Sequence, residues 1–168
     1  TVINVDVTGS TLSSSTASLS SAACGLAAPW CLAADGTNIY AGMLNNGGSP
    51  SYASWTGTSM ASPIVSGGVA LLTQAFPNHT PEQITDRLLA SANNDWFTAS
   101  GNTTFTTHGA SIKHGYHDNW GHGVPDFYAA LSPITSDSNP ASFGFPSSSG
   151  GSSSGGSSGS VPFSGALK

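Results

Sequence analysis

The feature that most restricts how this chain can fold is a turn of small residues that runs directly into an apolar segment. The turn reads Gly-Thr-Ser-Met-Ala-Ser-Pro over residues 57–63, and residues 64–72 are all small or apolar. Thr58 is a candidate N-cap, so that Ser59 would open the helix. A helix that is apolar or small on every side is normally buried. The sequence therefore predicts a largely buried helix from Ser59 to about Phe76.

A serine at such a helix start has a chemical use as well as a structural one. The first backbone N–H groups of a helix have no partner inside it, and this end carries a partial positive charge. A hydroxyl nucleophile beside free N–H donors is what acyl transfer requires, because the donors can hold a developing oxyanion. Ser59 is therefore a candidate nucleophile, and the alternative is that it only caps a buried helix.

The turn over residues 57–63 resembles the nucleophile motif of the subtilisin-like serine proteases, the subtilases, in which an apolar helix also follows. Ile64 departs from the family, which usually has a histidine there that is not the catalytic base. The resemblance extends to Ala34-Asp35-Gly36, where the family has Ala-Pro-Gly, and to the turn and short helix over residues 120–131. It implies an α/β fold over residues 1–133: the C-terminal part of a subtilisin-like parallel sheet flanked by helices, incomplete in this chain.

The same resemblance implies a serine endopeptidase that hydrolyses proteins or peptides through an acyl-enzyme on Ser59. In the family the aspartate and histidine of the triad and the oxyanion-hole asparagine all precede the nucleophile, and no histidine precedes Ser59 here. These residues are expected on an upstream segment, and the chain alone is expected to be inactive. Asn4 does not lie in the oxyanion motif and receives no role. The alternative is a secreted, non-catalytic binding or structural module built on a degenerate subtilase core.

The two cysteines of the chain, Cys24 and Cys31, are separated by a short stretch that contains glycine and proline and can fold back on itself. A local disulfide is expected, with free thiols as the alternative, and it would indicate an oxidising compartment. The pair is also similar to that of bacterial autotransporter-type subtilases. That similarity implies a secreted or cell-surface protein of bacterial origin and an outer-membrane translocator beyond the C-terminus.

The charge content excludes several other classes of protein. The chain has 3 Lys and Arg against 8 Asp and Glu, a net charge of −5, and no basic stripe, so nucleic acid is not an expected partner. No apolar run reaches membrane-spanning length, and residues 1–4 do not look like a signal peptide.

Residues 134–168 are rich in serine and glycine and are expected to form a flexible linker or tail, disordered from about Ser142 onward.

All five histidines follow Ser59 in the sequence: His79, His108, His114, His117 and His122. The spacing of His114, His117 and His122, together with Asp118, would permit a metal site. Glycine-spaced histidines in a loop are more often solvated or bonded to the backbone, so no metal ligand is assigned and their role is left open. The family resemblance would allow bound calcium, but no calcium site can be identified from these residues.

Short elements are expected on either side of the nucleophile. Residues 2–7 alternate and are rich in β-branched side chains, which predicts a strand. Further short strands are expected at residues 31–34 and 38–41, followed by an exposed loop at 45–50. Thr80, Pro81 and Gln83 are typical of a capped helix start. A long polar loop with a candidate hairpin near residues 103–106 precedes the last helix.

Overall fold

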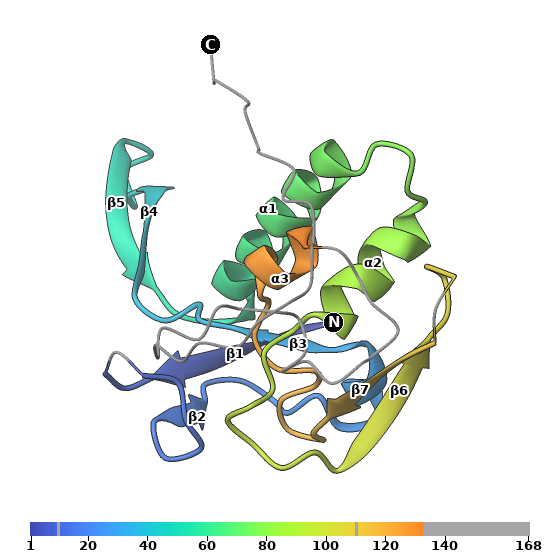
Figure 1. The fold of residues 1–168 in the computed structure, drawn as a ribbon. Helices are drawn as coiled ribbons and strands as arrows, with labels where there is room; N and C mark the ends of the chain where they lie inside the picture. Colours follow the sequence, from blue (N-terminus) through green and yellow to red (C-terminus); the bar gives the residue numbers. More distant parts are fainter. Residues whose placement is uncertain (10, 110, 133–168) are drawn as a thin grey trace, which may run out of the picture.

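The computed structural model describes residues 1–9, 11–109 and 111–132, so the predicted tail at 134–168, including the disorder expected from Ser142, lies outside the described residues. The elements, in chain order (Figure 1), are β1 (Val2–Val7), β2 (Ala17–Leu19), the 3-10 helix η1 (Gly25–Trp30), β3 (Leu32–Ala34), β4 (Ile39–Leu44), β5 (Pro50–Trp55), α1 (Thr58–Ala75), α2 (Pro81–Ala90), β6 (Gly101–Phe105), β7 (Ile112–Tyr116) and α3 (Phe127–Leu131).

A three-stranded sheet of order β2-β1-β3 carries the candidate site. β1 and β3 run parallel, with Val2 opposite Leu32 and Asn4 opposite Ala34, and β2 pairs antiparallel with the end of β1. Parallel neighbours need a long connection between them, and here residues 8–31 provide it. Together with the helices that follow, this is the predicted α/β arrangement, present in part.

Side chains of β1 and β3 point alternately to two cores, as successive residues of a strand must. Leu32 and Ala34 join the cluster built by α1 and α2, with Val2 packed against it. Ile3 and Val5 join a second cluster with Cys31 and its neighbours on the opposite face of the sheet. Helices α1, α2 and α3 lie together on the face of the sheet that carries Leu32 and Ala34 (Figure 1).

Helix α1 is buried on one face only, so the prediction of a largely buried helix is wrong for the described chain. Its buried residues are Ala61, Val65, Gly68 and Leu72. Ile64, Val69 and Leu71 on the other faces are 41%, 36% and 55% exposed. The pattern of apolar residues shows what a helix is able to bury. The described residues supply packing partners, mainly β1, β3 and α2, for only one of its faces.

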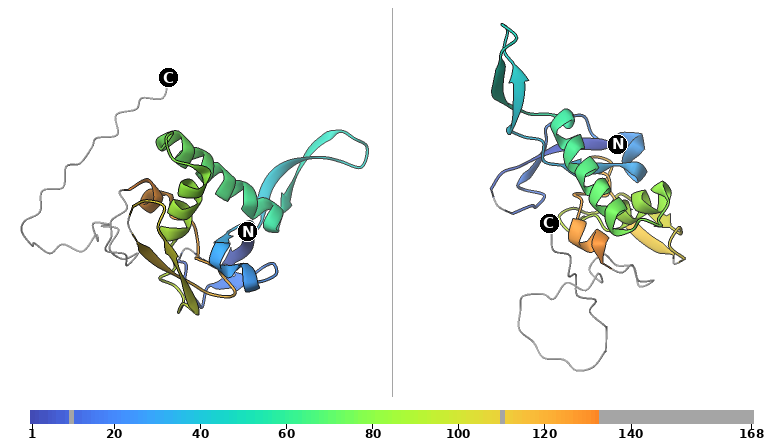
Figure 2. Two further views of the ribbon diagram at one scale, coloured as in Figure 1. Left: turned by 90° about the vertical axis from the view of Figure 1, so that its right-hand side faces the viewer. Right: turned by 90° about the horizontal axis from the view of Figure 1, so that it is seen from above.

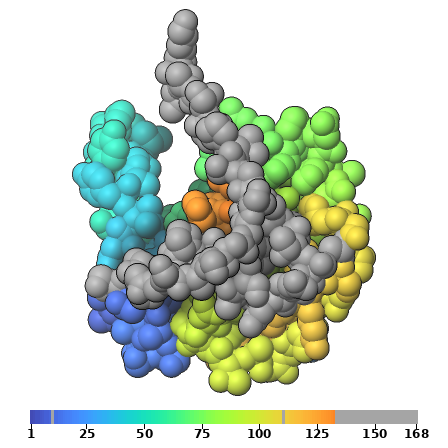
Figure 3. Space-filling model, viewed as in Figure 1, coloured from blue at the N-terminus to red at the C-terminus, as the bar shows by residue number. Residues whose placement is uncertain are grey.

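The segment before α1 forms a projecting hairpin, although only its first strand was predicted. β4 and β5 pair antiparallel from Ile39 and Trp55 at the base to Leu44 and Pro50 near the tip. The hairpin stands away from the body in every view (Figures 1, 2 and 3). Tyr40 and Tyr52 stack on each other with ring centroids 5.5 Å apart, yet they stay 71% and 66% exposed.

The C-terminal elements follow the prediction more closely. Helix α2 begins with the predicted capping box, in which Thr80 and Gln83 exchange side-chain and backbone hydrogen bonds. The candidate hairpin is present as β6 and β7, but it is longer than predicted and places His114 inside β7 rather than in a loop. Arg87 of α2 fixes the end of α3, because its Nη1 donates to the carbonyl oxygens of Ala130 and Ser132.

The predicted disulfide between Cys24 and Cys31 is present in the structure. Their Cα atoms are 6.1 Å apart, within the separation of about 7 Å that a disulfide allows. The bridge spans η1 and holds this segment against the second core. Within the described residues, none of the helices combines the length and apolar character that crossing a membrane requires.

Candidate active site

Ser59 is the second residue of α1, and it is exposed to solvent. The N-cap is Gly57 rather than the predicted Thr58, which already belongs to the helix. The reason is the backbone: Gly57 has a φ of +151°, a conformation that glycine adopts far more easily than other residues. The sharp turn is therefore made one residue earlier than the capping preference of threonine indicated.

The first turn of α1 leaves backbone donors free beside the Ser59 hydroxyl. The carbonyl oxygen of Gly57 accepts from the N–H groups of Met60 and Ala61, at 3.0 and 3.1 Å. No hydrogen bond to the N–H of Thr58 or Ser59 is found within the described part of the chain, and none to the Ser59 hydroxyl. A hydroxyl and free N–H donors thus lie together at the positive end of a helix.

The turn is held from outside the helix by the segment that follows β3. The N–H of Gly57 donates to the carbonyl oxygen of Gly36 at 3.1 Å. A side chain at Gly36 could not fit, because its Cβ would lie 2.5 Å from both the Gly57 oxygen and the Ala61 nitrogen. Asp35, at the position where the family has proline, accepts from the Thr37 N–H at 2.9 Å and forms its own turn.

None of the five histidines hydrogen-bonds to Ser59 among the residues that the structure describes. His79 lies just beyond the opposite end of α1 and stacks on Phe76. Burial, and then the charges of Arg87 and His108, lower the pKa of His79. The described chain therefore holds a candidate nucleophile without a base in hydrogen-bond contact.

His114 and His122 form a buried pair that the sequence did not indicate. Their Nδ1 atoms are 2.8 Å apart, and their Nε2 atoms lie 3.0 Å from the carbonyl oxygens of Ala92 and Pro29, respectively. Burial lowers the pKa of His114. Burial first, and then the charge of His114, lower the pKa of His122 to about 4. The alternation of β7 could have indicated that His114 is buried, but no local pattern marks His122.

The four residues that sequence spacing grouped as metal ligands are not brought together. His117 accepts from the Asn119 N–H, and Asp118 accepts from the Ser100 hydroxyl, while His114 and His122 bind each other. Across residues 1–9, 11–109 and 111–132, no group of three or more His, Cys, Asp or Glu side chains is arranged to hold a metal ion.

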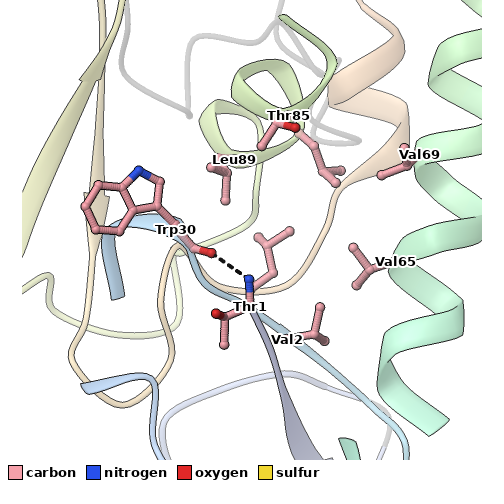
Figure 4. Close-up of a pocket in the computed structure, with 9 residues that line it drawn as sticks. Thr1, Val2, Trp30, Val65, Val69, Thr85 and Leu89 are labelled. Carbon is pink, nitrogen blue, oxygen red and sulfur yellow. Dashed lines mark hydrogen bonds between the residues drawn. The ribbon is translucent and has the colours of Figure 1, made fainter. Parts of the chain in front are cut away.

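An apolar pocket of about 140 Å³ lies away from the serine, between the start of β1 and helices α1 and α2 (Figure 4). The N-terminal amine of Thr1 donates to the Trp30 carbonyl at its edge, at 3.0 Å. Its other lining residues are Val2, Leu32, Val65, Val69, Thr85, Leu88 and Leu89. Ser59 is not among the lining residues, so the pocket is not the candidate active site.

Comparison with known proteins agrees with the predicted α/β fold. The sequence matches the profile of the subtilase family over residues 1–123. It is 39% identical over 85 residues to an extracellular serine protease of Serratia marcescens, covering 40% of this chain and 8% of that protein. The chain belongs to the subtilase family.

Two solved structures are similar to part of this chain. Fervidolysin from Fervidobacterium pennivorans, a keratinolytic enzyme related to subtilisin, is 27% identical, with a TM-score of 0.49 over 79% of this chain and 19% of that one. The serine protease MycP1 of the type VII (ESX-1) secretion system is 32% identical, with a TM-score of 0.38 over 60% of this chain and 24% of that one. The chain thus spans a minor part of each relative's length.

Proposed function

We propose that Ser59 is the nucleophile of a serine endopeptidase that cleaves peptide bonds of proteins through an acyl-enzyme. One observation carries the proposal: the exposed Ser59 lies at the N-terminus of α1 beside N–H groups of Thr58 and Ser59 that are unpaired in the described chain. The hydroxyl would attack the scissile carbonyl, and the free N–H groups would stabilise the oxyanion that forms. Proton transfer from the hydroxyl needs a base.

The base and its orienting carboxylate are proposed to come from chain that precedes Thr1. Two observations support this assignment. No histidine occurs among residues 1–58. In addition, Ile64 and Leu71, two turns apart on the same side of α1, are exposed, as apolar side chains of a helix are when its packing partner lies elsewhere. In subtilisin itself, loss of the catalytic histidine lowers turnover by about 10⁶, so this chain alone is expected to be inactive.

The protein is proposed to act in an oxidising space outside the cell, on protein or peptide substrates. The Cys24–Cys31 bridge supports this, because structural disulfides persist mainly in such compartments. The Serratia marcescens relative is described as extracellular. An outer-membrane translocator beyond the C-terminus stays a prediction from the family resemblance.

The test uses the protein produced together with its preceding chain. A fluorophosphonate should label it, and peptide mass spectrometry should place the label on Ser59. Ser59→Ala should abolish both labelling and cleavage of an unfolded protein substrate. Ser62→Ala, one turn further along the same helix, is the matched control and should keep activity. Wild-type cleavage by Ser59→Ala would show that the assignment is wrong, and a folded wild type that neither labels nor cleaves would favour the non-catalytic binding module.

A further inference from the structure

Asn4 is a buried amide in the middle of a hydrophobic strand. It is 0% exposed, and its neighbours in β1 are Ile3 and Val5. Its Oδ1 accepts from the N–H of Gly36 at 2.6 Å, and its Nδ2 donates to the Thr37 hydroxyl at 3.5 Å. Both ends of the amide therefore engage the segment that follows β3, although residues 4 and 36 are far apart in the sequence.

The backbone of Gly36 connects this amide to the serine turn. Its N–H donates to Asn4, and its carbonyl oxygen accepts from the N–H of Gly57. Gly57 in turn accepts from the first turn of α1, in which Ser59 lies. The close approach of Gly36 to the Gly57 oxygen leaves no room for even a methyl group, so a shift of Gly36 displaces the turn.

The amide is not needed to keep β1 in the sheet. The backbone N–H of Asn4 donates to the Ser21 hydroxyl at 3.0 Å, and its carbonyl oxygen accepts from the Ser20 N–H at 3.1 Å. Strand β1 also pairs with β3 along its own backbone. The side chain of Asn4 therefore serves the Gly36 segment, while other groups hold its backbone.

We propose that Asn4 is a positioning residue for Ser59, fixing the nucleophile turn through Gly36 and Gly57. The inference rests on the proposed function of Ser59 and adds a residue remote in sequence to its machinery. Removing the amide oxygen leaves the Gly36 N–H buried without an acceptor, which drives this peptide to move. A displacement of about 1 Å at a reacting group can lower a rate by about 10².

The kinetic test compares three variants of the protein produced with its preceding chain. Asn4→Leu keeps the size of the side chain and removes the acceptor; we expect kcat and the rate of phosphonate labelling to fall about 10- to 100-fold, with KM nearly unchanged. Asn4→Asp keeps an oxygen for Gly36 and should recover most of the rate. Ser21→Ala, the matched control, loosens the backbone of Asn4 without touching its amide and should leave both rates unchanged.

Amide hydrogen exchange tests the same coupling without requiring activity. In Asn4→Leu the N–H groups of Gly36 and Gly57 should exchange faster than in the wild type and in Ser21→Ala. If the wild type fails to label at Ser59, the proposed function fails, and the exchange of Gly57 still decides whether Asn4 holds the turn. Unchanged Gly57 exchange, or equal kcat in Asn4→Leu and Ser21→Ala, would overturn the inference.

A milder variant covers the case in which Asn4→Leu does not fold. Thr37→Val removes only the acceptor of the Asn4 Nδ2 and leaves the bond from Gly36 in place. Its labelling rate should fall by a smaller factor, of about two to five, because the amide that holds Gly36 is then itself held at one end only. A labelling rate equal to that of Ser21→Ala would contradict the proposal.

Discussion

His114 and His122 make three short contacts that compete for too few hydrogens. One joins the two Nδ1 atoms at 2.8 Å, and each Nε2 lies 3.0 Å from a backbone carbonyl oxygen. Two neutral imidazoles carry one N–H each, so one of the three contacts has no hydrogen to share. A single added proton would complete all three hydrogen bonds, but burial disfavours the charge that comes with it.

We predict that His122 titrates well below an ordinary histidine, at a pKa of about 4, because it is buried and lies against His114. An unfolded chain takes up this proton near pH 6.5. Between these values the unfolded state binds more protons, so the free energy of unfolding decreases as the pH falls from about 6.5 to about 4. Below that window this residue causes no further loss, because both states are then protonated.

Nuclear magnetic resonance titration of the histidine rings measures this pKa directly. The control is the same titration in concentrated urea, in which the His122 signal should move to about pH 6.5. Folded protein in which His122 already takes up its proton near pH 6.5 would contradict the burial argument.

At the scale of single elements, the start of α2 is the clearest case of a local signal. Thr80 Oγ1 accepts from the Gln83 N–H at 3.2 Å, and Gln83 Oε1 accepts from the Thr80 N–H at 2.9 Å. We expect Thr80→Ala to lower the free energy of unfolding by about 1 kcal/mol. Urea unfolding measures this difference. Thr85→Ala, in the exposed middle of the same helix, is the control and should cost nothing, because alanine is the better helix former; equal losses would count against the cap.

Elements specified by adjacent residues could be predicted, and elements specified by distant partners could not. The cap of α2 and the β-branched run of β1 were predicted because the residues that cause them are neighbours in the chain. β5 was missed, since the run from Pro50 to Trp55 is mostly small and polar and forms a strand by pairing with β4. The exposed face of α1 was mispredicted for the same reason, as burial depends on a partner element.

The same distinction between adjacent residues and distant partners applies to the candidate site. Contiguous residues indicated Ser59 as the candidate nucleophile and predicted a helix there, with its start one residue later than the structure has it. Asn4 was given no role, because its partners Gly36 and Thr37 come near it only after β1 and β3 have paired. The His114–His122 pair was also hidden, since the contact that defines it joins a strand to a later loop. A hydrogen bond between residues far apart in the chain produces no pattern among neighbouring residues from which it could be predicted.

At the scale of the whole molecule, the Cys24–Cys31 bridge closes a short loop of sequence separation 7 at the edge of the second core. We expect the double variant Cys24→Ser/Cys31→Ser to lose about 2–3 kcal/mol of unfolding free energy, the value that loop entropy gives for a loop of this size. Chemical unfolding with and without dithiothreitol measures it. The wild type should weaken in the reductant and the double variant should not; an insensitive wild type would show that the bridge adds no stability.

Residues 122 and 123 lie along the edge of β3 that β1 leaves open. The N–H of His122 donates to the Cys31 carbonyl oxygen, and the N–H of Ala33 donates to the Gly123 carbonyl oxygen, both at 2.8 Å. Because residues 122 and 123 follow Ser59 in the sequence, Ser59 is synthesised well before the residues that pair with this edge. Until residues 122 and 123 have been added, the growing chain carries its serine turn without the segment that pairs with this edge of β3.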